Sequence, residues 1–258
     1  MEIYGYSERG AMNALFYGMA FNNDEEAMHS FLIKAGIEQA NSFHKFELYT
    51  EFSLSEFGSP DLVIFATKGD KKVVFFVEAK ASCCKSYELK RQKESHDKYI
   101  ENGEYDDGHA SNLFFQLRLK NYFYQLKEWF CRGRLGDRPT VNIKDDKNKR
   151  ILKTNNHYRG IGNNAIVQKF VDKFNDCTEA YYIAIIPEYN NEGIKTDYGF
   201  TIHYVSWSQI YNLFKERSEY QSLLDTIKFN QGKDPTIKSK NRIVSQILNN
   251  PIPDKYLA

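Results

Sequence analysis

The sequence predicts an α/β protein with one central mixed β-sheet, helices flanking the sheet, and an inserted basic segment. Helical patterns come first, then a meander of apolar strands, a long helix and further strands, which is an order typical of α/β or α+β domains with a single sheet. With 258 residues, 41% of them hydrophobic and 27% charged, the chain can bury a sizeable core and is not disordered throughout. We expect a single domain spanning residues 1–258.

The first two elements are expected to be helices. The segment SERGAMNALFYGMAF predicts a helix capped by Ser7, with its apolar residues on one side. A second helix is expected from about residue 24 to residue 35. Asn23 and Glu26 suit a capping box at its start, and Gly36 is a natural stop.

Three strands are expected to follow as a meander. The segment HKFELYTEFSL alternates apolar and polar residues, which predicts a strand with one wetter face. Two strongly apolar runs, Leu62–Ala66 and Val73–Val77, then meet at a turn containing Lys, Gly and Asp. The polar stretch from about Lys85 to Gly108 is expected to be irregular.

The second half of the chain predicts a long helix, a short amphipathic helix and two more strands. An apolar stripe at helical spacing runs from about Ser111 to Phe130, and a shorter one contains Phe170 and Phe174. The segments EAYYIAIIP and GFTIHYVSW read as strands. A helix should begin at about Trp207, where the preceding serine and the glutamine three residues later form a capping box.

Two regions are set apart by their composition. Residues 132–176 are expected to form an insertion or subdomain, and residues 228–258 a loosely packed basic tail. From 132 to 159 there are nine basic and three acidic residues, although the whole chain carries a net charge of only +1. This surplus suggests a phosphate-binding surface, the alternative being a solvated loop. The residues expected to contact nucleic acid are Arg132, Arg134, Lys149, Arg150, Lys153, Tyr158 and Arg159.

The two apolar runs bring charged residues together if they form a hairpin. A two-residue loop at Gly69–Asp70, or a four-residue loop around it, sets Asp61 directly opposite Glu78. Lys80 lies two residues beyond Glu78 and therefore points to the same face. A three- or five-residue loop would shift the register and separate these residues. Hydrophobic pairing favours the first register.

Two opposed carboxylates at the end of a buried hairpin repel each other and are costly to desolvate. A raised pKa, a neighbouring cation such as Lys80, or a bound divalent metal would stabilise them. Carboxylate and backbone oxygens are the ligands that Mg²⁺ prefers. A metal site is therefore expected here, although Ser-Pro-Asp is also a common turn and Glu-x-Lys also ends many surface strands.

Pro60-Asp61 followed by Glu78-Ala79-Lys80 resembles the PD-(D/E)XK motif of the restriction-endonuclease-like nuclease superfamily. The order of elements is also similar, with a first helix, a three-strand meander carrying the motif, a helix and a further strand. The resemblance implies a restriction-endonuclease-like fold in which Asp61, Glu78 and the carbonyl of Ala79 ligate Mg²⁺, or alternatively Mn²⁺. It further implies that Lys80 positions or helps to deprotonate the attacking water and stabilises the transition state.

Two more residues join the site by this resemblance. Many members carry a glutamate on the first helix, and Glu8 is the matching candidate for a catalytic residue and metal ligand. Some exonuclease branches carry a glutamine on the helix after the motif, which makes Gln116 a catalytic candidate. In those branches a tyrosine follows the glutamine by four residues, whereas this chain has Lys120 at that position. The alternatives are a favourable acid in a first helical turn for Glu8 and a solvated polar stripe for Gln116.

Other features limit the cofactors and the location. Four cysteines include an adjacent pair, no apolar leader follows Met1, and no apolar run approaches membrane-spanning length, so a reduced, cytoplasmic protein without a membrane partner is expected. The absence of a Walker A sequence excludes an ATP-driven translocase within this chain. A zinc site is a weaker alternative because its spacing matches no familiar finger or ribbon; it would use Cys83, Cys84, His96 and His109.

The function expected from the sequence is Mg²⁺-dependent hydrolysis of nucleic acid, with DNA as the expected substrate and an endonuclease of restriction, phage defence or repair as the expected class. Endonucleases of this kind often dimerise to cut both strands, which leaves a homodimer open. The alternative is a non-catalytic nucleic-acid-binding or protein-interaction module on the same fold.

Overall fold

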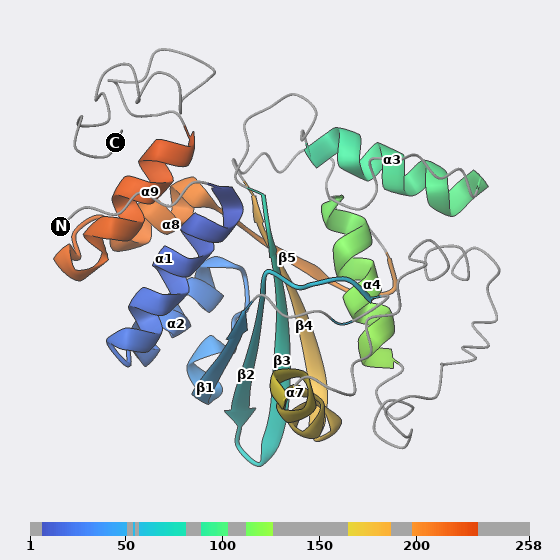
Figure 1. Cartoon of the computed structure of the whole chain (residues 1–258), viewed down its shortest axis with the longest axis horizontal. Helices are drawn as coiled ribbons and strands as arrows, with labels where there is room; N and C mark the ends of the chain where they lie inside the picture. Colours follow the sequence, from blue (N-terminus) through green and yellow to red (C-terminus); the bar gives the residue numbers. More distant parts are fainter. Residues whose placement is uncertain are drawn as a thin grey trace, which may run out of the picture.

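The computed structural model describes residues 7–50, 54, 57–80, 89–102, 112–125, 165–186 and 198–231. Its centre is a five-stranded mixed β-sheet flanked by helices, an α/β architecture (Figure 1). The strand order in the sheet follows the order in the chain. The strands are β1 (Phe43–Thr50), β2 (Leu62–Lys68), β3 (Lys71–Ala79), β4 (Cys177–Ile186) and β5 (Ile202–Ser206).

The first three strands form an antiparallel meander, whereas β3, β4 and β5 run parallel to one another. The β2–β3 hairpin closes with a two-residue loop between Lys68 and Lys71, and it pairs Leu62 with Val77. Gly69 in that loop has a φ of 59°, in the left-handed region that glycine adopts without strain. The register predicted from the sequence is therefore confirmed.

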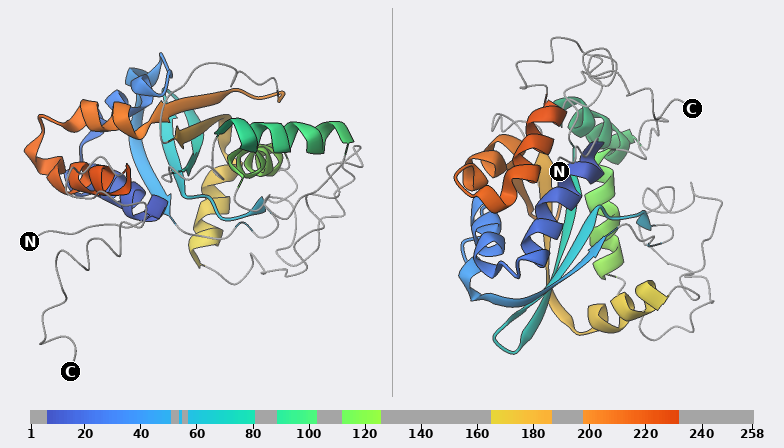
Figure 2. Two further views of the ribbon diagram at one scale, coloured as in Figure 1. Left: turned by 90° about the horizontal axis from the view of Figure 1, so that it is seen from above. Right: turned by 60° about the vertical axis from the view of Figure 1, so that its left-hand side comes forward.

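Helices cover both faces of the sheet, in two separate layers (Figure 2). One layer contains α1 (Ser7–Phe21), α2 (Glu25–Lys34), α8 (Trp207–Phe214) and α9 (Gln221–Gln231), with the short 3₁₀ turns η1 (Ala40–Ser42) and η6 (Ser218–Tyr220). The other layer contains α3 (Leu89–Asn102), α4 (Leu113–Gln125) and α7 (Ala165–Asn175). Among the described helices, none has both the length and the apolar character needed to cross a bilayer.

The starts of α2 and α8 follow local side-chain chemistry. Ser206 and Gln209 form the capping box expected at the start of α8. At α2, however, the cap is Asp24, whose carboxylate accepts a hydrogen bond from the Ala27 amide at 2.9 Å. The predicted cap, Asn23, instead has a φ of 50° in the preceding turn, so that prediction was wrong by one residue.

The stretch expected to be irregular contains a helix, α3, from Leu89 to Asn102. Its buried positions, Gln92, His96 and Tyr99, lie four and three residues apart on one side of the helix. Two of the three are polar, so the stretch lacks the apolar stripe from which a helix is recognised in sequence. This expectation is corrected by the structure.

Helix α3 fixes the start of α4. The side-chain oxygen of Gln92 accepts a hydrogen bond from the Leu113 amide at 2.8 Å. The backbone carbonyl of Gln92 accepts a second one from the Asn112 side chain, also at 2.8 Å. Asn112 caps α4 by accepting from the Phe114 amide at 2.9 Å. The position of α4 over the sheet therefore depends on α3.

Part of the predicted domain organisation can be placed. Helix α7 lies within the predicted insertion, yet its Phe170 and Phe174 are buried against Phe123 of α4. Helix α9 continues through Gln231, so the first residues of the predicted 228–258 tail are helical. Residues 132–164 and 232–258 lie outside the described part of the chain.

The Gln92 contacts can be tested by unfolding. Gln92→Ala leaves the buried Leu113 amide without its acceptor, and we expect it to lower the free energy of unfolding by about 1–3 kcal/mol. Arg91→Ala changes an exposed neighbour and should shift it by less than about 0.5 kcal/mol. Urea denaturation followed by circular dichroism measures both. Equal stability of the two variants would contradict a structural role of Gln92.

Candidate active site

Alternation along the hairpin places the motif residues on one face of the sheet. Val74 and Phe76 of β3 point to the α4 layer, whereas Phe75 and Val77 point to the α1 layer. By the same alternation Glu78 and Lys80 point to the α4 layer. Asp61 directly precedes Leu62, the first residue of β2, at the same end of the hairpin.

Asp61 is tied to the backbone of the neighbouring strand. Its Oδ2 accepts a hydrogen bond from the Ala79 amide at 2.8 Å, and its side chain is half-buried. Ala79 is the residue between Glu78 and Lys80. The bond therefore holds the Asp61 carboxylate beside the segment that carries the other two motif residues.

Glu78 is fully buried, and its closest charged neighbour is a lysine of α4. Its Oε1 lies 2.7 Å from Nζ of Lys120, and both side chains are 0% exposed. Within the described residues, Oε2 of Glu78 has no hydrogen-bond partner. Burial raises the pKa of Glu78 to about 7; the charge of Asp61 adds to this rise, and the ammonium groups of Lys120 and Lys80 oppose it.

Lys80 is held at both its backbone and its side chain. Its amide donates to the Ile185 carbonyl of β4 at 2.8 Å, and its carbonyl accepts from the indole of Trp207 at 3.2 Å. Its Nζ donates to Oε1 of Gln116 at 3.0 Å. The side chain is only 4% exposed, so this ammonium group is placed with little freedom.

The polar stripe on α4 faces the motif rather than solvent. Gln116 contacts Lys80, Lys120 contacts Glu78, and Asn112 caps the helix, so the alternative of a solvated stripe does not hold. Lys120 is the residue that the sequence interpretation missed as part of the site. The available signal was a lysine four residues after Gln116, on a helix that is otherwise largely apolar.

Gly58 has no side chain, and this leaves room for the ammonium group of Lys120 beside it. This glycine has a φ of 78°, and a Cβ at this position would lie 3.3 Å from Nζ of Lys120. A side chain here would be strained and would crowd the buried cation. Gly58 stands shortly before Asp61, so the segment that leads into β2 also shapes this side of the site.

Several predicted residues are not part of this described group. Glu8 lies in the first turn of α1, a helix of the other layer, and its side chain is outside the described part, so its role stays a prediction. Of the weaker zinc alternative, only His96 is described; it packs among Phe114, Phe115 and Tyr198. The residues expected to contact nucleic acid all lie in the undescribed range 126–164.

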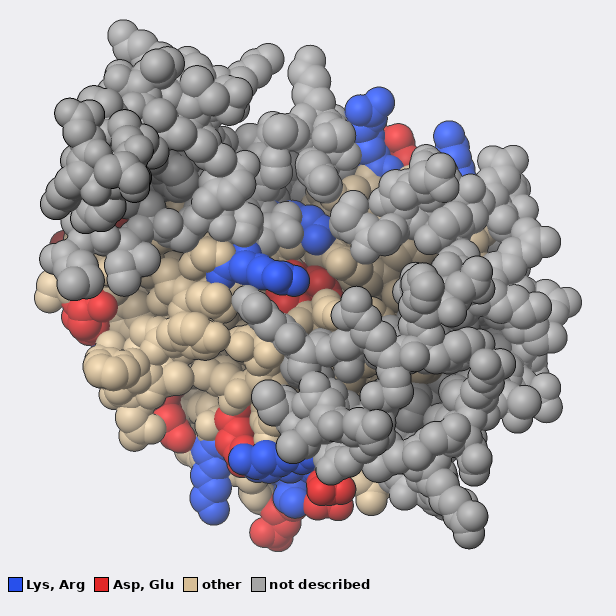
Figure 3. All heavy atoms as spheres, in the orientation of Figure 1, with Lys and Arg blue, Asp and Glu red and all other residues tan. Residues whose placement is uncertain are grey.

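One face of the molecule carries charges of both signs near its centre. Figure 3 shows lysine or arginine side chains beside acidic ones near the centre of the face seen in Figure 1. The surface over α1 and α2 is mainly uncharged.

Comparison with known proteins gives no relative for this chain. No protein-family model matches it, and no curated protein or solved structure is significantly similar. The chemistry of the site therefore has to be inferred from its own residues. Those residues are two carboxylates and two lysines at one end of a hairpin, with an amide side chain oriented toward one lysine.

The buried ion pair predicts a pH-dependent effect of removing Lys120. The pKa of Glu78 is about 7 in the folded state against an ordinary 4.5, so its contribution to stability is present below pH 4.5 and is lost as the pH rises to about 7. In Lys120→Met, Glu78 can remain protonated at pH 5. At pH 8 wild-type Glu78 is mostly ionised beside Lys120, whereas in the variant its pKa is raised further and it has to keep its proton, so we expect the loss of stability to be about 1 kcal/mol larger at pH 8 than at pH 5.

Chemical denaturation in EDTA at the two pH values measures this difference. The exposed Lys90→Met serves as the control and should have little effect at either pH. An equal loss for Lys120→Met at pH 5 and pH 8 would show that its side chain contributes by packing rather than by charge.

Proposed function

We propose that this protein is a divalent-metal-dependent nuclease of the PD-(D/E)XK superfamily, acting on DNA as an endonuclease. One observation carries the proposal. Asp61, Glu78 and Lys80 lie at one end of the β2–β3 hairpin, on one face, with Glu78 fully buried and Lys80 almost so. A surface strand end would leave these charges in water.

The arrangement of elements supports a restriction-endonuclease-like fold. A helix precedes an antiparallel meander that carries the motif, helix α4 covers the motif face, and a parallel strand, β4, follows beside β3. The polar residues of α4 also point toward the motif. Fold alone does not define activity, so the proposal depends on the residues of the site.

The donor atoms suit a small, hard cation. Oε2 of Glu78 is buried without a hydrogen-bond partner among the described residues, and a metal ion would satisfy it. Asp61, Glu78 and the carbonyl oxygen of Ala79 offer oxygen ligands only, the set that Mg²⁺ or Mn²⁺ prefers, and Glu8 is a further proposed ligand. When bound, the ion would lower the pKa of a water molecule and neutralise phosphate charge.

Lys80 is the proposed catalytic cation of the chain itself. Its ammonium group holds the attacking water and stabilises the negative charge that develops as the new P–O bond forms and the leaving P–O bond breaks. Gln116 orients that ammonium group through its 3.0 Å contact. Because the Lys80 backbone is fixed by β4 and Trp207, the group needs little reorganisation during the reaction.

Lys120 has a different role, which is to make a buried Glu78 anion tolerable. Even with this lysine beside it, the pKa of Glu78 is about 7, so a substantial fraction of the side chain is protonated at neutral pH. Metal binding then releases a proton and is favoured by higher pH. Lys120 is thus a positioning residue that acts through Glu78.

The proposed DNA contacts come from the basic segment, which lies outside the described residues. Its surplus of positive charge within 132–159 supports an electrostatic contribution to binding. Two parts of the proposal rest on the resemblance of the motif alone. These are a role in restriction, phage defence or repair, and a homodimer that cuts both strands.

Cleavage assays test the catalytic roles. We expect Mg²⁺- or Mn²⁺-dependent nicking or linearisation of plasmid DNA that EDTA stops. Lys80→Ala and Glu78→Gln should each slow it by about a hundredfold or more, because each removes a group that acts on the transition state directly or through the metal. Lys90→Ala, an exposed lysine of α3, serves as the control.

DNA affinity and folding are measured for every variant. Wild-type activity in a folded Lys80→Ala variant with unchanged DNA affinity would overturn the proposed mechanism. DNA binding without cleavage by wild type in either metal would favour the non-catalytic binding module. Cleavage of RNA in place of DNA would correct the substrate.

Gln116 can be separated from the other residues by kinetics. Gln116→Ala should lower the rate of the cleavage step by about tenfold with little change in DNA affinity, because it frees the Lys80 side chain without removing its charge. Gln125→Ala removes an exposed glutamine from the same helix and should leave the rate unchanged. Equal single-turnover rates for the two variants would exclude a role for Gln116.

A further inference from the structure

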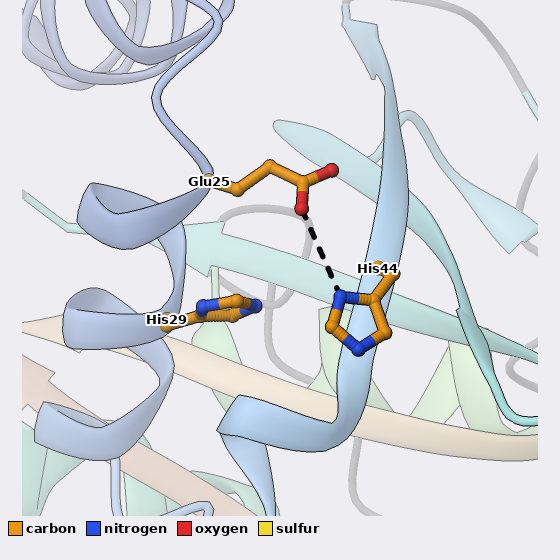
Figure 4. Close-up of side chains that lie close together, drawn as sticks. All are labelled: Glu25, His29 and His44. Atoms are coloured by element: carbon orange, nitrogen blue, oxygen red, sulfur yellow. Dashed lines mark ion pairs between the residues drawn. The ribbon is translucent and has the colours of Figure 1, made fainter.

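A second group of metal-ligating side chains lies between α2 and the start of β1. Glu25 and His29 stand four residues apart on α2, and His44 is the second residue of β1. The three side chains point toward one another (Figure 4). One ligand atom from each lies within 4.8 Å of the others.

The carboxylate of Glu25 links the helix to the strand. Its Oε1 accepts a hydrogen bond from the Lys45 amide at 3.1 Å, and its Oε2 lies 3.8 Å from Nδ1 of His44. Lys45 has a φ of 55°, and the β1–β2 register shifts between His44 and Glu47. Glu25 therefore holds the irregular part of β1 that presents His44.

His29 is oriented by the same strand. Its Nε2 lies 2.7 Å from the carbonyl oxygen of Phe43, the residue before His44. Its ring lies edge-on to those of His44 and Phe46, with centroids 6.0 and 5.5 Å away. This contact with the Phe43 carbonyl therefore fixes the position of the His29 ring, one of the three potential ligands.

The spacing is close to that of a tetrahedral zinc site. Bonds of about 2.0–2.1 Å to zinc put neighbouring ligand atoms about 3.4 Å apart. The 3.8 Å between His44 and Glu25, and a spacing of at most 4.8 Å within the whole group, mean that the side chains have to close by at most about 1.4 Å to reach it. The His44 side chain is 57% exposed, which lets it turn and gives the ion a path from solvent.

We propose that Glu25, His29 and His44 bind a Zn²⁺ ion, with the fourth position open to water. Two imidazoles and one carboxylate form a ligand set typical of zinc, whereas the Asp61–Glu78 group offers oxygen alone. The site joins α2 to the edge strand β1. It lies near the opposite end of β1–β2 from Asp61, about 20 Å away at the usual rise per strand residue. It does not depend on the proposed nuclease activity.

Calorimetric titration tests the site in the full chain, without a histidine tag. The protein is stripped with EDTA, dialysed into buffer with excess Mg²⁺ so that oxygen-only sites are filled, and titrated with Zn²⁺. We expect one ion per chain. His44→Ala and Glu25→Gln should each weaken binding by about tenfold or more. Glu26→Gln, an exposed neighbour on α2, should bind as wild type does.

Two further measurements make the result specific. Zn²⁺ should raise the melting temperature of wild type and Glu26→Gln but not of His44→Ala, whose exposed position makes a folding defect a small risk. Co²⁺ bound at the site should give visible absorption without a thiolate charge-transfer band, which separates it from binding by cysteines.

Failure of wild type to bind Zn²⁺ would overturn the proposal and leave Glu25 and His44 as a simple ion pair. Undiminished binding by both His44→Ala and Glu25→Gln, or a thiolate band with Co²⁺, would also overturn it by locating the ion elsewhere. None of these outcomes bears on DNA cleavage, because Asp61, Glu78 and Lys80 are unchanged in every variant.

Discussion

The register of the β2–β3 hairpin is the constraint on which the site depends. The two-residue loop at Gly69–Asp70 sets which residues oppose each other and, through the alternation of side chains, which face each one occupies. A slip of one residue would move Glu78 into the apolar layer below α1 and α2 and would replace it above the sheet with an alanine. The turn therefore determines which charged side chains meet at the strand ends, six or more residues away.

The second dependence runs through the helices. Glu78 is buried because α4 covers it, and α4 supplies the lysine that makes this burial tolerable. The start of α4 is held in turn by Gln92 of α3, so a helix that contributes no residue to the described site helps to determine where Lys120 lies. Fold and site are thus coupled by a short series of hydrogen bonds in addition to the apolar packing of α4 on the sheet.

The sequence predicted the local and periodic parts of this structure and missed the long-range polar ones. The hairpin register and the Ser206 capping box follow from residues near one another in the chain, and both were predicted correctly. Helix α3 was missed because its buried side is polar, as Gln92 and His96 show. Lys120 looked like a solvated lysine because only the folded chain brings it against Glu78, 42 positions earlier in the sequence.

The buried pair of Glu78 and Lys120 raises the question of why the protein buries two charged side chains at all. An apolar pair of similar volume in place of Glu78 and Lys120 would be neutral or even stabilising, because the attraction between two buried ions barely offsets their lost hydration. Stability alone therefore gives no reason for a carboxylate whose Oε2 has no hydrogen-bond partner among the described residues. A ligand that binds to that oxygen does give one. The proposed divalent cation beside Asp61 would do so, because it would add positive charge next to a Glu78 carboxylate whose pKa stays at about 7 despite Lys120 and Lys80. Under that proposal, the energetic cost of burying Glu78 in the metal-free protein follows from the geometry that metal binding requires.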